Sequence, residues 1–347
     1  MEFQDYFKFA IDRRASDLHL IAGNKAVLRV DGELLFINDE YLDNKFLEES
    51  LVKVLEPNRL KEFRDNKELD FSYQVFGHRF RVNLHYQESM IGISARLIQL
   101  DAPKPEQVGF TDPMLNLTRL KDGLILVTGP SGAGKSTTLA TMVGIINNTR
   151  RAHVVTVEDP IEYIFNDNLS IVEQREVGSD TLSFANALKY VLRQDPNVIM
   201  IGEMRDLETI SAALTAAETG HLVLSTLHTN SAPEAVARII DSFPTYRKQQ
   251  VLTQLSLSLR AIISQQLIPR IGGGQVAARE ILINNPAIAN LIRENKISQI
   301  GNVIKTGYQE GMIDMNKSVE ILNEQGLIDD VTAERYKRDM ETRGMYA

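Results

Sequence analysis

The chain has 347 residues, of which 43% are hydrophobic and 24% charged, with a net charge of −8; this length and composition are typical of a globular protein of two or three domains. The chain contains no cysteine, which excludes disulfides and cysteine-ligated zinc. No apolar run reaches the roughly 18 residues that a membrane helix needs, and residues 1–10 lack the basic start and apolar core of a secretory signal. We therefore expect a cytoplasmic protein without direct membrane insertion, and the acidic balance without a dense Lys/Arg block disfavours nucleic-acid binding.

Residues 1–100 predict a small α+β domain. Phe3, Phe7 and Ile11 recur at helical spacing, so we expect an amphipathic helix over residues 3–14. The segment 27–37 predicts a β-hairpin that turns at Asp31-Gly32. The other expected elements of this domain are a helix over residues 43–55 and strands over residues 69–75, 79–86 and 91–97.

Residues 101–115 predict a linker, because they contain several prolines and lack periodicity. From Gly123 onward, short apolar strands alternate with helices, which is typical of an α/β domain with a mostly parallel sheet. This domain is expected over residues 116–285, followed by a helical region over residues 286–347. Its expected strands are residues 124–128, 154–157, 198–201 and 222–226, and its expected helices begin at about 135, 182 and 207.

Residues 129–136, Gly-Pro-Ser-Gly-Ala-Gly-Lys-Ser, match the phosphate-binding pattern G-x-x-x-x-G-K-[ST] between a predicted strand and a predicted helix. The glycines let backbone N–H groups wrap around phosphates, and the helix N-terminus adds positive potential. Lys135 is expected to reach the β- and γ-phosphates and Ser136 to ligate Mg²⁺. We therefore predict ATP and Mg²⁺ as ligands, with nucleotide contacts from Gly129, Ser131, Gly132, Ala133, Gly134, Lys135, Ser136 and Thr137.

A second strand end supplies an acid. The apolar residues 198–201 are followed by Gly202 and Glu203. A carboxylate at this place can orient the attacking water, accept its proton or hold Mg²⁺ through water. We predict Glu203 as a catalytic residue and, with Ser136, as a magnesium ligand. Taken alone, Glu203 would fit equally well as a solvated carboxylate in a turn.

Three acids follow another predicted strand, at Glu158, Asp159 and Glu162. Carboxylates this close together need a counter-charge, which Mg²⁺ with ATP would supply. We predict Glu158 and Asp159 as nucleotide contacts and Glu162 as a second candidate for the catalytic base. The same stretch also fits the start of a helix, with Asp159 as N-cap and Pro160 in the first position, and both interpretations can hold together.

Two histidines flank a fourth predicted strand, His221 before it and His228 after it. Residues seven apart in an ideal strand face opposite sides, so the pair does not fit a shared metal site. His228 lies at the carboxyl end of the strand, where ligands bind in open α/β sheets. We predict His228 as a sensor of the γ-phosphate and His221 as a structural or interface residue that supports the nucleotide site.

Together these motifs resemble those of the secretion and pilus ATPases. The Walker A, Asp box, Walker B and His box of that group are similar to residues 129–136, 158–162, 201–206 and 220–229. Further signatures of the group resemble residues 15–20 (Ala-Ser-Asp-Leu-His-Leu), 174–178 (Gln-Arg-Glu-Val-Gly) and 217–221 (Ala-Glu-Thr-Gly-His). The resemblance extends over essentially the whole chain and is strongest to the type IV pilus retraction ATPases, the PilT/PilU family.

The resemblance implies an ATP-hydrolysing motor with a PAS-like N-terminal domain and a RecA-like ATPase domain, assembled as a homo-hexamer. It also implies that Arg81 and Arg96 contact the nucleotide phosphates, a role for which the guanidinium group is suited. The sequence alone would leave both as ordinary strand residues. The family works at the cytoplasmic face of the inner membrane, so the implied partners are a pilus platform protein and a paralogous retraction ATPase.

One position departs from the retraction family's pattern. Residues 287–294 read Ala-Ile-Ala-Asn-Leu-Ile-Arg-Glu, with Ala289 where that family usually carries an arginine, and the PilU branch also tends to lack it. Residues 265–269 resemble the PilU branch as well, whereas residues 203–206 and His228-Thr229 resemble the PilT branch. The alternatives are therefore an accessory PilU-type motor, a pilus-assembly or type II secretion ATPase, a nucleic-acid translocase and a non-motor ATP-binding module.

Overall fold

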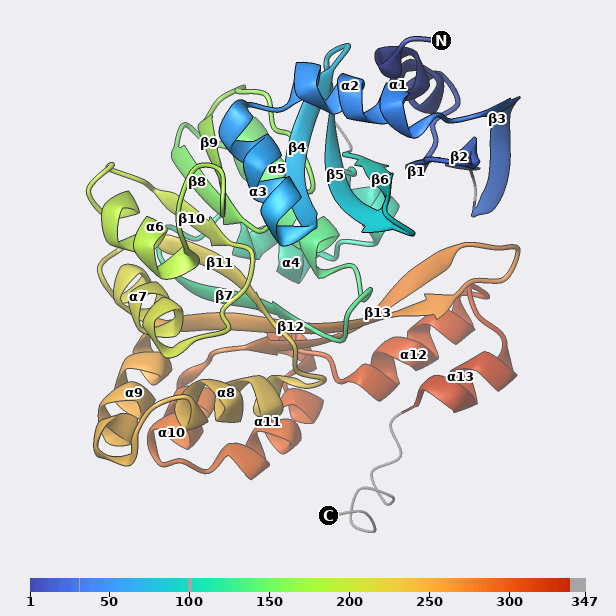
Figure 1. The fold of residues 1–347 in the computed structure, drawn as a ribbon. Helices are drawn as coiled ribbons and strands as arrows, with labels where there is room; N and C mark the ends of the chain where they lie inside the picture. Colours follow the sequence, from blue (N-terminus) through green and yellow to red (C-terminus); the bar gives the residue numbers. More distant parts are fainter. Residues whose placement is uncertain (31, 99–101, 338–347) are drawn as a thin grey trace. The chain divides into compact units, whose positions relative to one another are not determined.

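The computed structural model describes residues 1–30, 32–98 and 102–337. The chain divides into two compact units, one of Met1–Asp101 with Glu162–Ile164 and one of Ala102–Ile161 with Phe165–Ala347 (Figure 1). Three features of the sequence prediction lie outside the described residues: Asp31 of the hairpin turn, the first linker residue, Asp101, and the end of the C-terminal region, residues 338–347.

The first unit is built on a six-stranded antiparallel sheet with the order β3-β2-β1-β6-β5-β4. Its strands are β1 (Asp17–Ile21), β2 (Lys25–Val30), β3 (Glu33–Tyr41), β4 (Glu68–Val75), β5 (His78–Gln87) and β6 (Met90–Leu97). Its helices are α1 (Phe3–Asp12), α2 (Asn44–Val54) and α3 (Pro57–Asn66).

One face of this sheet carries the core of the first unit. Phe80, Val82 and Leu84 alternate with more exposed residues along β5, as a half-buried strand requires. The buried residues of the sheet form one cluster with Phe7 of α1 and Leu47 of α2. The opposite face carries polar side chains of β1, β5 and β6, among them His19, Arg81 and Arg96.

The second unit is built on a seven-stranded sheet with the order β13-β12-β7-β11-β10-β8-β9, in which only β13 runs antiparallel to its neighbour. β7 and β11 are buried at every position, because helices cover both faces of a sheet of this kind. The strands are β7 (Gly123–Thr128), β8 (His153–Glu158), β9 (Ile171–Glu176), β10 (Val198–Ile201), β11 (Leu222–Leu227), β12 (Leu259–Pro269) and β13 (Gln275–Ile283).

Helices cover the two faces unequally (Figure 1). The helices packed on one face are α4 (Asp112–Leu117) and α5 (Lys135–Thr149). The opposite face is covered by α6 (Phe184–Val191), α7 (Leu207–Glu218), α8 (Ala232–Asp241), α9 (Thr245–Ser258), α10 (Pro286–Arg293) and α11 (Ile300–Thr306). Short 3-10 turns are formed by Pro105–Val108, Ile297–Gln299 and Tyr308–Glu310.

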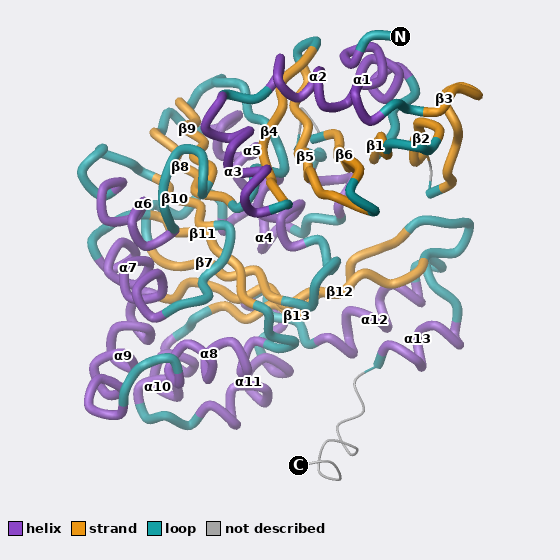
Figure 2. Tube along the Cα trace, in the orientation of Figure 1, coloured by secondary structure: helices purple, strands orange, loops and turns teal. Residues whose placement is uncertain are grey.

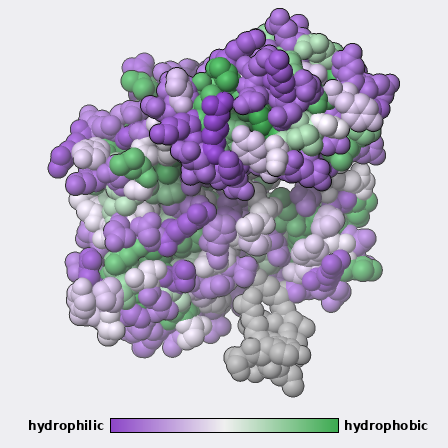
Figure 3. All heavy atoms as spheres, viewed as in Figure 1, coloured by the Kyte–Doolittle hydropathy of each residue, from purple (hydrophilic) through white to green (hydrophobic). Residues whose placement is uncertain are grey.

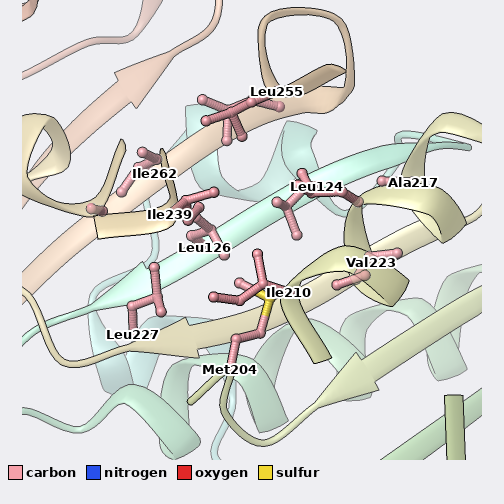
Figure 4. Packing of buried hydrophobic residues seen from close by; sticks show 14 of the residues in the cluster. Leu124, Leu126, Met204, Ile210, Ala217, Val223, Leu227, Ile239, Leu255 and Ile262 are labelled. Carbon is pink, nitrogen blue, oxygen red and sulfur yellow. The ribbon is translucent and has the colours of Figure 1, made fainter. Parts of the chain in front are cut away.

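The larger core cluster lies between the sheet and α7–α9. Leu124 and Leu126 of β7 meet Ile210 of α7, Ile239 of α8 and Leu255 of α9 (Figure 4). Burying side chains of this size contributes on the order of 2 kcal/mol each. This packing fixes β7, and with it the place where the phosphate-binding loop leaves the sheet.

The β12–β13 hairpin supports the last two helices of the described residues, α12 (Met315–Glu324) and α13 (Asp330–Tyr336) (Figure 2). Ile268 and Ala278 of the hairpin form a small separate core with Met315 and Val319 of α12 and Ala333 of α13. The hairpin and these helices therefore form one extension of the second unit.

Most predicted elements are confirmed, with shifted ends: the first helix covers Phe3–Asp12, and the helix expected from about 182 covers Phe184–Val191. The hairpin is also confirmed, with Val30 paired to Glu33. The helix start considered at Pro160 is wrong, because residues 159–170 contain no helix. The prediction missed β1, α3, α4, β9, α8, α9, β12 and β13, and α4 begins inside residues 101–115, which were expected to form a linker.

No described helix is both long and apolar enough to cross a membrane. On the face seen in Figure 3, hydrophilic residues dominate and hydrophobic ones form scattered patches. The bulk of the large apolar side chains lies in the cores of the two units.

Candidate nucleotide-binding and catalytic site

The phosphate-binding loop joins β7 to α5, and Gly134 occupies the N-cap position of α5. Gly129, Gly132 and Gly134 have φ angles of 148°, 77° and 78°, a region that favours glycine. A Cβ atom on Gly129 would collide with the backbone oxygen of Gln265 on β12. The glycines therefore permit both the turn of the loop and its close approach to the neighbouring strand.

Lys135 points back over this loop. Its Nζ atom donates to the carbonyl oxygens of Gly129 and Pro130, both at 2.9 Å, and lies 3.5 Å from His228 Nδ1. The residue is only 8% exposed. The ammonium group is thus held inside the loop, at the start of a helix whose N-terminus attracts anions.

Glu203 and His228 follow strands that are parallel neighbours in the sheet. Leu227 of β11 pairs with Thr128 of β7, and Ile201 of β10 pairs with Ser225 of β11. The carboxyl ends of these strands therefore meet at one edge, where ligands bind in sheets of this type. This edge is also where the phosphate-binding loop begins.

The Glu203 carboxylate lies between two basic side chains. Its Oε1 atom forms an ion pair with Arg205, and its Oε2 atom lies 3.3 Å from His228 Nε2. Oε2 is buried, and within the described residues the geometry provides it with no hydrogen-bond donor, the histidine included. Lys135, His228 and Glu203 thus form one continuous group, and Glu203 retains an oxygen able to accept a proton from water.

Three hydrogen bonds tie the segment around Glu203 to β11. Ser225 Oγ donates to the Ile201 carbonyl at 2.9 Å, Thr226 Oγ1 donates to the Gly202 carbonyl at 2.7 Å, and the Met204 N–H donates to the Thr226 carbonyl at 3.1 Å. Glu203 and His228 therefore belong to one bonded frame.

The acids after β8 differ from one another. Glu158 is 7% exposed and accepts hydrogen bonds from Thr156 Oγ1 at 2.7 Å and Gln174 Nε2 at 3.3 Å. Asp159 is exposed, and Glu162 lies in the short segment that groups with the first unit. Their roles toward the nucleotide stay predictions.

A pocket of about 620 Å³ adjoins the loop. That volume is typical of small-molecule sites. Its lining includes Phe110, Gly134, Thr137, Thr138, Leu267 and Arg279. The pocket continues from the helix start of α5 toward the β12–β13 hairpin.

Residues 3–300 match the family model described as Type II/IV secretion system protein. The chain belongs to this family. It is 45% identical over 329 residues to the type IV pilus retraction ATPase PilT of Pseudomonas aeruginosa, covering 94% of this chain and 96% of PilT. It is 39% identical over 330 residues to the type IV pilus ATPase PilU of the same organism, covering 94% of this chain and 86% of PilU. The crystal structure of the pilus retraction motor PilT with bound ADP matches with a TM-score of 0.91 at 45% identity, covering 98% of each chain.

These matches confirm the predicted fold class of this family member, a RecA-like α/β ATPase domain with a smaller N-terminal domain. They also support the nucleotide as the ligand of the P-loop, because the matching motor contains ADP. Thr229, beside His228, has a buried hydroxyl that finds no hydrogen-bond partner among the described residues. A buried donor of this kind fits a polar ligand at the same edge.

In this family member Arg81 and Arg96 are directly paired across β5 and β6. The same row continues to Asp17 on β1 and Arg29 on β2. Arg96 Nε donates to Asp17 Oδ1 at 2.9 Å, and both Arg81 and Arg96 are exposed. The row thus holds three arginines and one carboxylate, an excess of positive charge that suits an anionic ligand.

His221 lies at the opposite end of β11 from His228. Its Nδ1 atom is 3.0 Å from the Ala216 carbonyl oxygen and 3.3 Å from Thr219 Oγ1, at the end of α7. The structure thus places it at the amino edge of the sheet and does not bring it to the P-loop. Its predicted support of the nucleotide site stays a prediction.

The residues available for Mg²⁺ are oxygen donors, which this ion prefers. Ser136 follows Lys135 in the first turn of α5, and the buried Glu203 Oε2 atom has no hydrogen bond from the described residues. No group of three or more His, Asp or Glu side chains within the described ranges is placed to hold a metal ion. Ser136 and Glu203 are oxygen donors of the kind that Mg²⁺ prefers, and their role as its ligands stays a prediction.

Sequence reasoning missed a buried polar group behind the loop, Gln265 and Arg279 on β12 and β13 with Thr138 on α5. Gln265 is 2% exposed and Arg279 is 6% exposed. A signal existed, because Ser264, Gln265 and Gln266 interrupt an otherwise apolar run, and polar residues inside a buried strand need partners.

Proposed function

We propose that this chain is an ATP-hydrolysing motor that drives the retraction of type IV pili. The observation that carries the proposal is the contact of His228 with both Lys135 and Glu203 beside the phosphate-binding loop. The chain that holds this group matches the retraction motor over nearly its full length. ATP, rather than ADP alone, is the proposed substrate, because a carboxylate beside the P-loop provides for hydrolysis.

The proposed chemistry assigns one task to each group. Backbone N–H groups of residues 129–136 and the Lys135 ammonium group bind the phosphates. The Glu203 carboxylate orients the attacking water and accepts its proton. His228, within 3.5 Å of Lys135 and 3.3 Å of Glu203, responds to the γ-phosphate. When bound through Ser136 and Glu203, Mg²⁺ supplies positive charge to the phosphate oxygens.

Two further parts of the site are proposed from the sequence motifs and the family resemblance, and a third from the pocket beside the loop. Glu158 and Asp159 support the nucleotide site, and Glu162 is the alternative base. Arg81 and Arg96 contact the nucleotide phosphates, and their basic row across β5 and β6 supports this role. The pocket between Thr138 and Leu267 receives the nucleoside, since its volume of about 620 Å³ suffices.

The assembly proposed for this motor is a ring of six identical subunits. One heterologous interface, repeated six times, closes such a ring. The ring works at the cytoplasmic face of the inner membrane, where successive nucleotide-driven movements displace the pilus platform protein. Retraction then follows from the return of pilin to the membrane.

The test is a count of surface pili together with twitching motility in cells that carry Lys135→Ala. Abundant pili without motility are expected for a retraction motor. Loss of pili would show that the motor drives assembly instead. Normal pili with normal motility would contradict an obligatory role in either direction.

A second candidate is an accessory retraction ATPase of the PilU type. The observation that favours it is Ala289 on α10, a half-buried position where retraction ATPases usually carry arginine. Replacing Ala289 by Arg separates the two candidates. Both forms of the protein are tested in a strain that lacks its other retraction ATPases. Motility that appears only with Ala289→Arg supports the accessory role, whereas full motility with the unsubstituted protein contradicts it.

A further inference from the structure

Gln265 and Arg279 pair across the β12–β13 hairpin, directly behind the phosphate-binding loop. β12 lies beside β7, where Ser264 pairs with Thr128. Gln265 therefore stands opposite Gly129, the residue with which the loop leaves the sheet. Both residues line the pocket beside the loop, but neither has an assigned role in the chemistry proposed above.

The Gln265 side chain holds the loop with both ends of its amide. Its Nε2 atom donates to the Ala133 carbonyl at 2.6 Å. Its Oε1 atom accepts a hydrogen bond from Thr138 Oγ1 at 2.8 Å and lies 3.4 Å from the donor Arg279 Nε. A single buried side chain thus connects the last part of the loop with the first turn of α5.

The bond to Ala133 has a geometric consequence for phosphate binding. The carbonyl of one residue and the N–H of the next point in opposite directions across a planar trans peptide. The only cis peptide bond among the described residues is Asp159–Pro160, so the Ala133–Gly134 bond is trans. Holding the Ala133 carbonyl against the Gln265 side chain on β12 therefore directs the Gly134 N–H away from that side chain.

Arg279 fixes Gln265 in turn. Its Nη1 and Nη2 atoms donate to the carbonyls of Gly109 and Val108 at 2.7 and 2.6 Å, and its guanidinium lies 5.9 Å from the centre of the Phe110 ring. Burial lowers the pKa of Arg279 to about 10, so the group stays charged at neutral pH. A buried charge requires such acceptors, and the segment 108–110 supplies them.

We propose that Gln265 is a positioning residue for the phosphate-binding loop, and that Arg279 couples the segment 108–110 to that loop through Gln265. The proposal rests on the proposed nucleotide binding. It means that ADP on the loop and the order of segment 108–110 stabilise each other, because both depend on the same amide.

The experiment compares the full-length protein with Gln265→Leu and with the matched control Gln266→Leu. Gln266 is the next residue of β12 and contacts α13 instead of the loop. Three quantities are measured: the Kd for ADP, the steady-state kcat and KM for ATP, and hydrogen exchange of residues 105–111 and 129–138. Thermal unfolding shows that each variant is folded.

Gln265→Leu is expected to raise the Kd for ADP about tenfold, as the loss of a buried hydrogen bond to the loop predicts. It should speed exchange in residues 129–138 before nucleotide is added, and ADP should no longer protect residues 105–111. Gln266→Leu should change none of these. Arg279→Lys keeps the charge but loses the paired hydrogen bonds to the carbonyls of Val108 and Gly109, so it should raise the Kd for ADP about threefold. This variant tests the coupling if Gln265→Leu does not fold.

Unchanged ADP affinity and loop exchange in folded Gln265→Leu would overturn the positioning role. Protection of residues 105–111 by ADP in that variant would overturn the coupling. If instead the unsubstituted protein and Gln266→Leu both fail to bind ADP, the proposed function fails. Loop exchange without nucleotide still decides the positioning role in that case.

Discussion

The two sheets of this protein present their candidate site residues in opposite ways. In the second unit, Lys135, Glu203 and His228 all follow parallel strands, and the register of those strands brings them to one edge. In the first unit, Arg81 and Arg96 lie within antiparallel strands, on an exposed face. A parallel sheet with crossover helices thus gathers residues that are far apart in sequence at a predictable place.

An antiparallel sheet has no such preferred end. In such a sheet the sequence shows only the alternation of buried and exposed residues along each strand. This alternation indicates that Arg81 points away from the core, but it does not indicate what Arg81 binds. The family resemblance was therefore needed to single out Arg81 and Arg96. The comparison predicts that substitutions at the parallel edge have the larger effects on turnover.

The largest effect is expected for Lys135→Ala. The substitution removes the cation that the loop holds over Gly129 and Pro130, so turnover should fall by at least about a thousandfold. Steady-state ATP hydrolysis by the purified protein measures this. Near-normal turnover would contradict the assignment of the site.

Glu203→Gln should come next. The amide cannot accept the proton of the attacking water, so kcat should fall on the order of a hundredfold to a thousandfold while ADP still binds. Glu208→Gln, an exposed carboxylate in the first turn of α7, is the matched control and should leave kcat unchanged. Equal losses of kcat in Glu203→Gln and Glu208→Gln would contradict a special role of the parallel edge. A larger loss of kcat in Glu162→Gln than in Glu203→Gln would identify Glu162 as the catalytic base.

Arg81→Ala and Arg96→Ala test the antiparallel face. Each should lower kcat roughly tenfold to a hundredfold through lost stabilisation of phosphate charge. Arg64→Ala, on α3 and paired with Glu48, is the control from the helical side of the same unit. Full ATPase activity in both Arg81→Ala and Arg96→Ala would show that neither arginine contributes to ATP hydrolysis.

The smallest effect is expected for Asp17→Asn. Burial raises the pKa of Asp17, but hydrogen bonds from Ser16 and Arg96 outweigh it and hold the pKa below its usual value. A lowered carboxyl pKa adds stability above the unfolded pKa and loses it as pH falls through the folded pKa. Asp17→Asn should therefore cost less than about 1 kcal/mol at neutral pH and nothing below the folded pKa, as urea unfolding at several pH values can show.

The fold was predictable where apolar runs were continuous. β7, β8, β10 and β11 are short buried runs with clear ends, and each was expected. β9 has the sequence Ile-Val-Glu-Gln-Arg-Glu at the sheet edge, where burial does not exclude charge, so its pattern gave no signal. β12 was missed because three polar residues interrupt it.

The site was predictable as far as strand ends determine it. Lys135, His228 and Glu203 were expected and do meet. The bond between Gln265 and Ala133 joins residues on strand and loop segments far apart in sequence, and no spacing rule indicates such a contact. The short chain of bonds around Glu203 likewise depends on the register of β10 and β11, which only the folded sheet defines.

The frame that ties Gly202 and Met204 to Thr226 limits how the site can move. These hydrogen bonds hold the residues on either side of Glu203 to β11, two residues before His228, so separating Glu203 from His228 would require them to break. Asp206, three residues beyond Glu203, caps α7 through the Thr209 N–H at 2.7 Å. Only three residues separate Glu203 from the N-cap of α7, so the position of the catalytic carboxylate is tied both to the start of that helix and to β11.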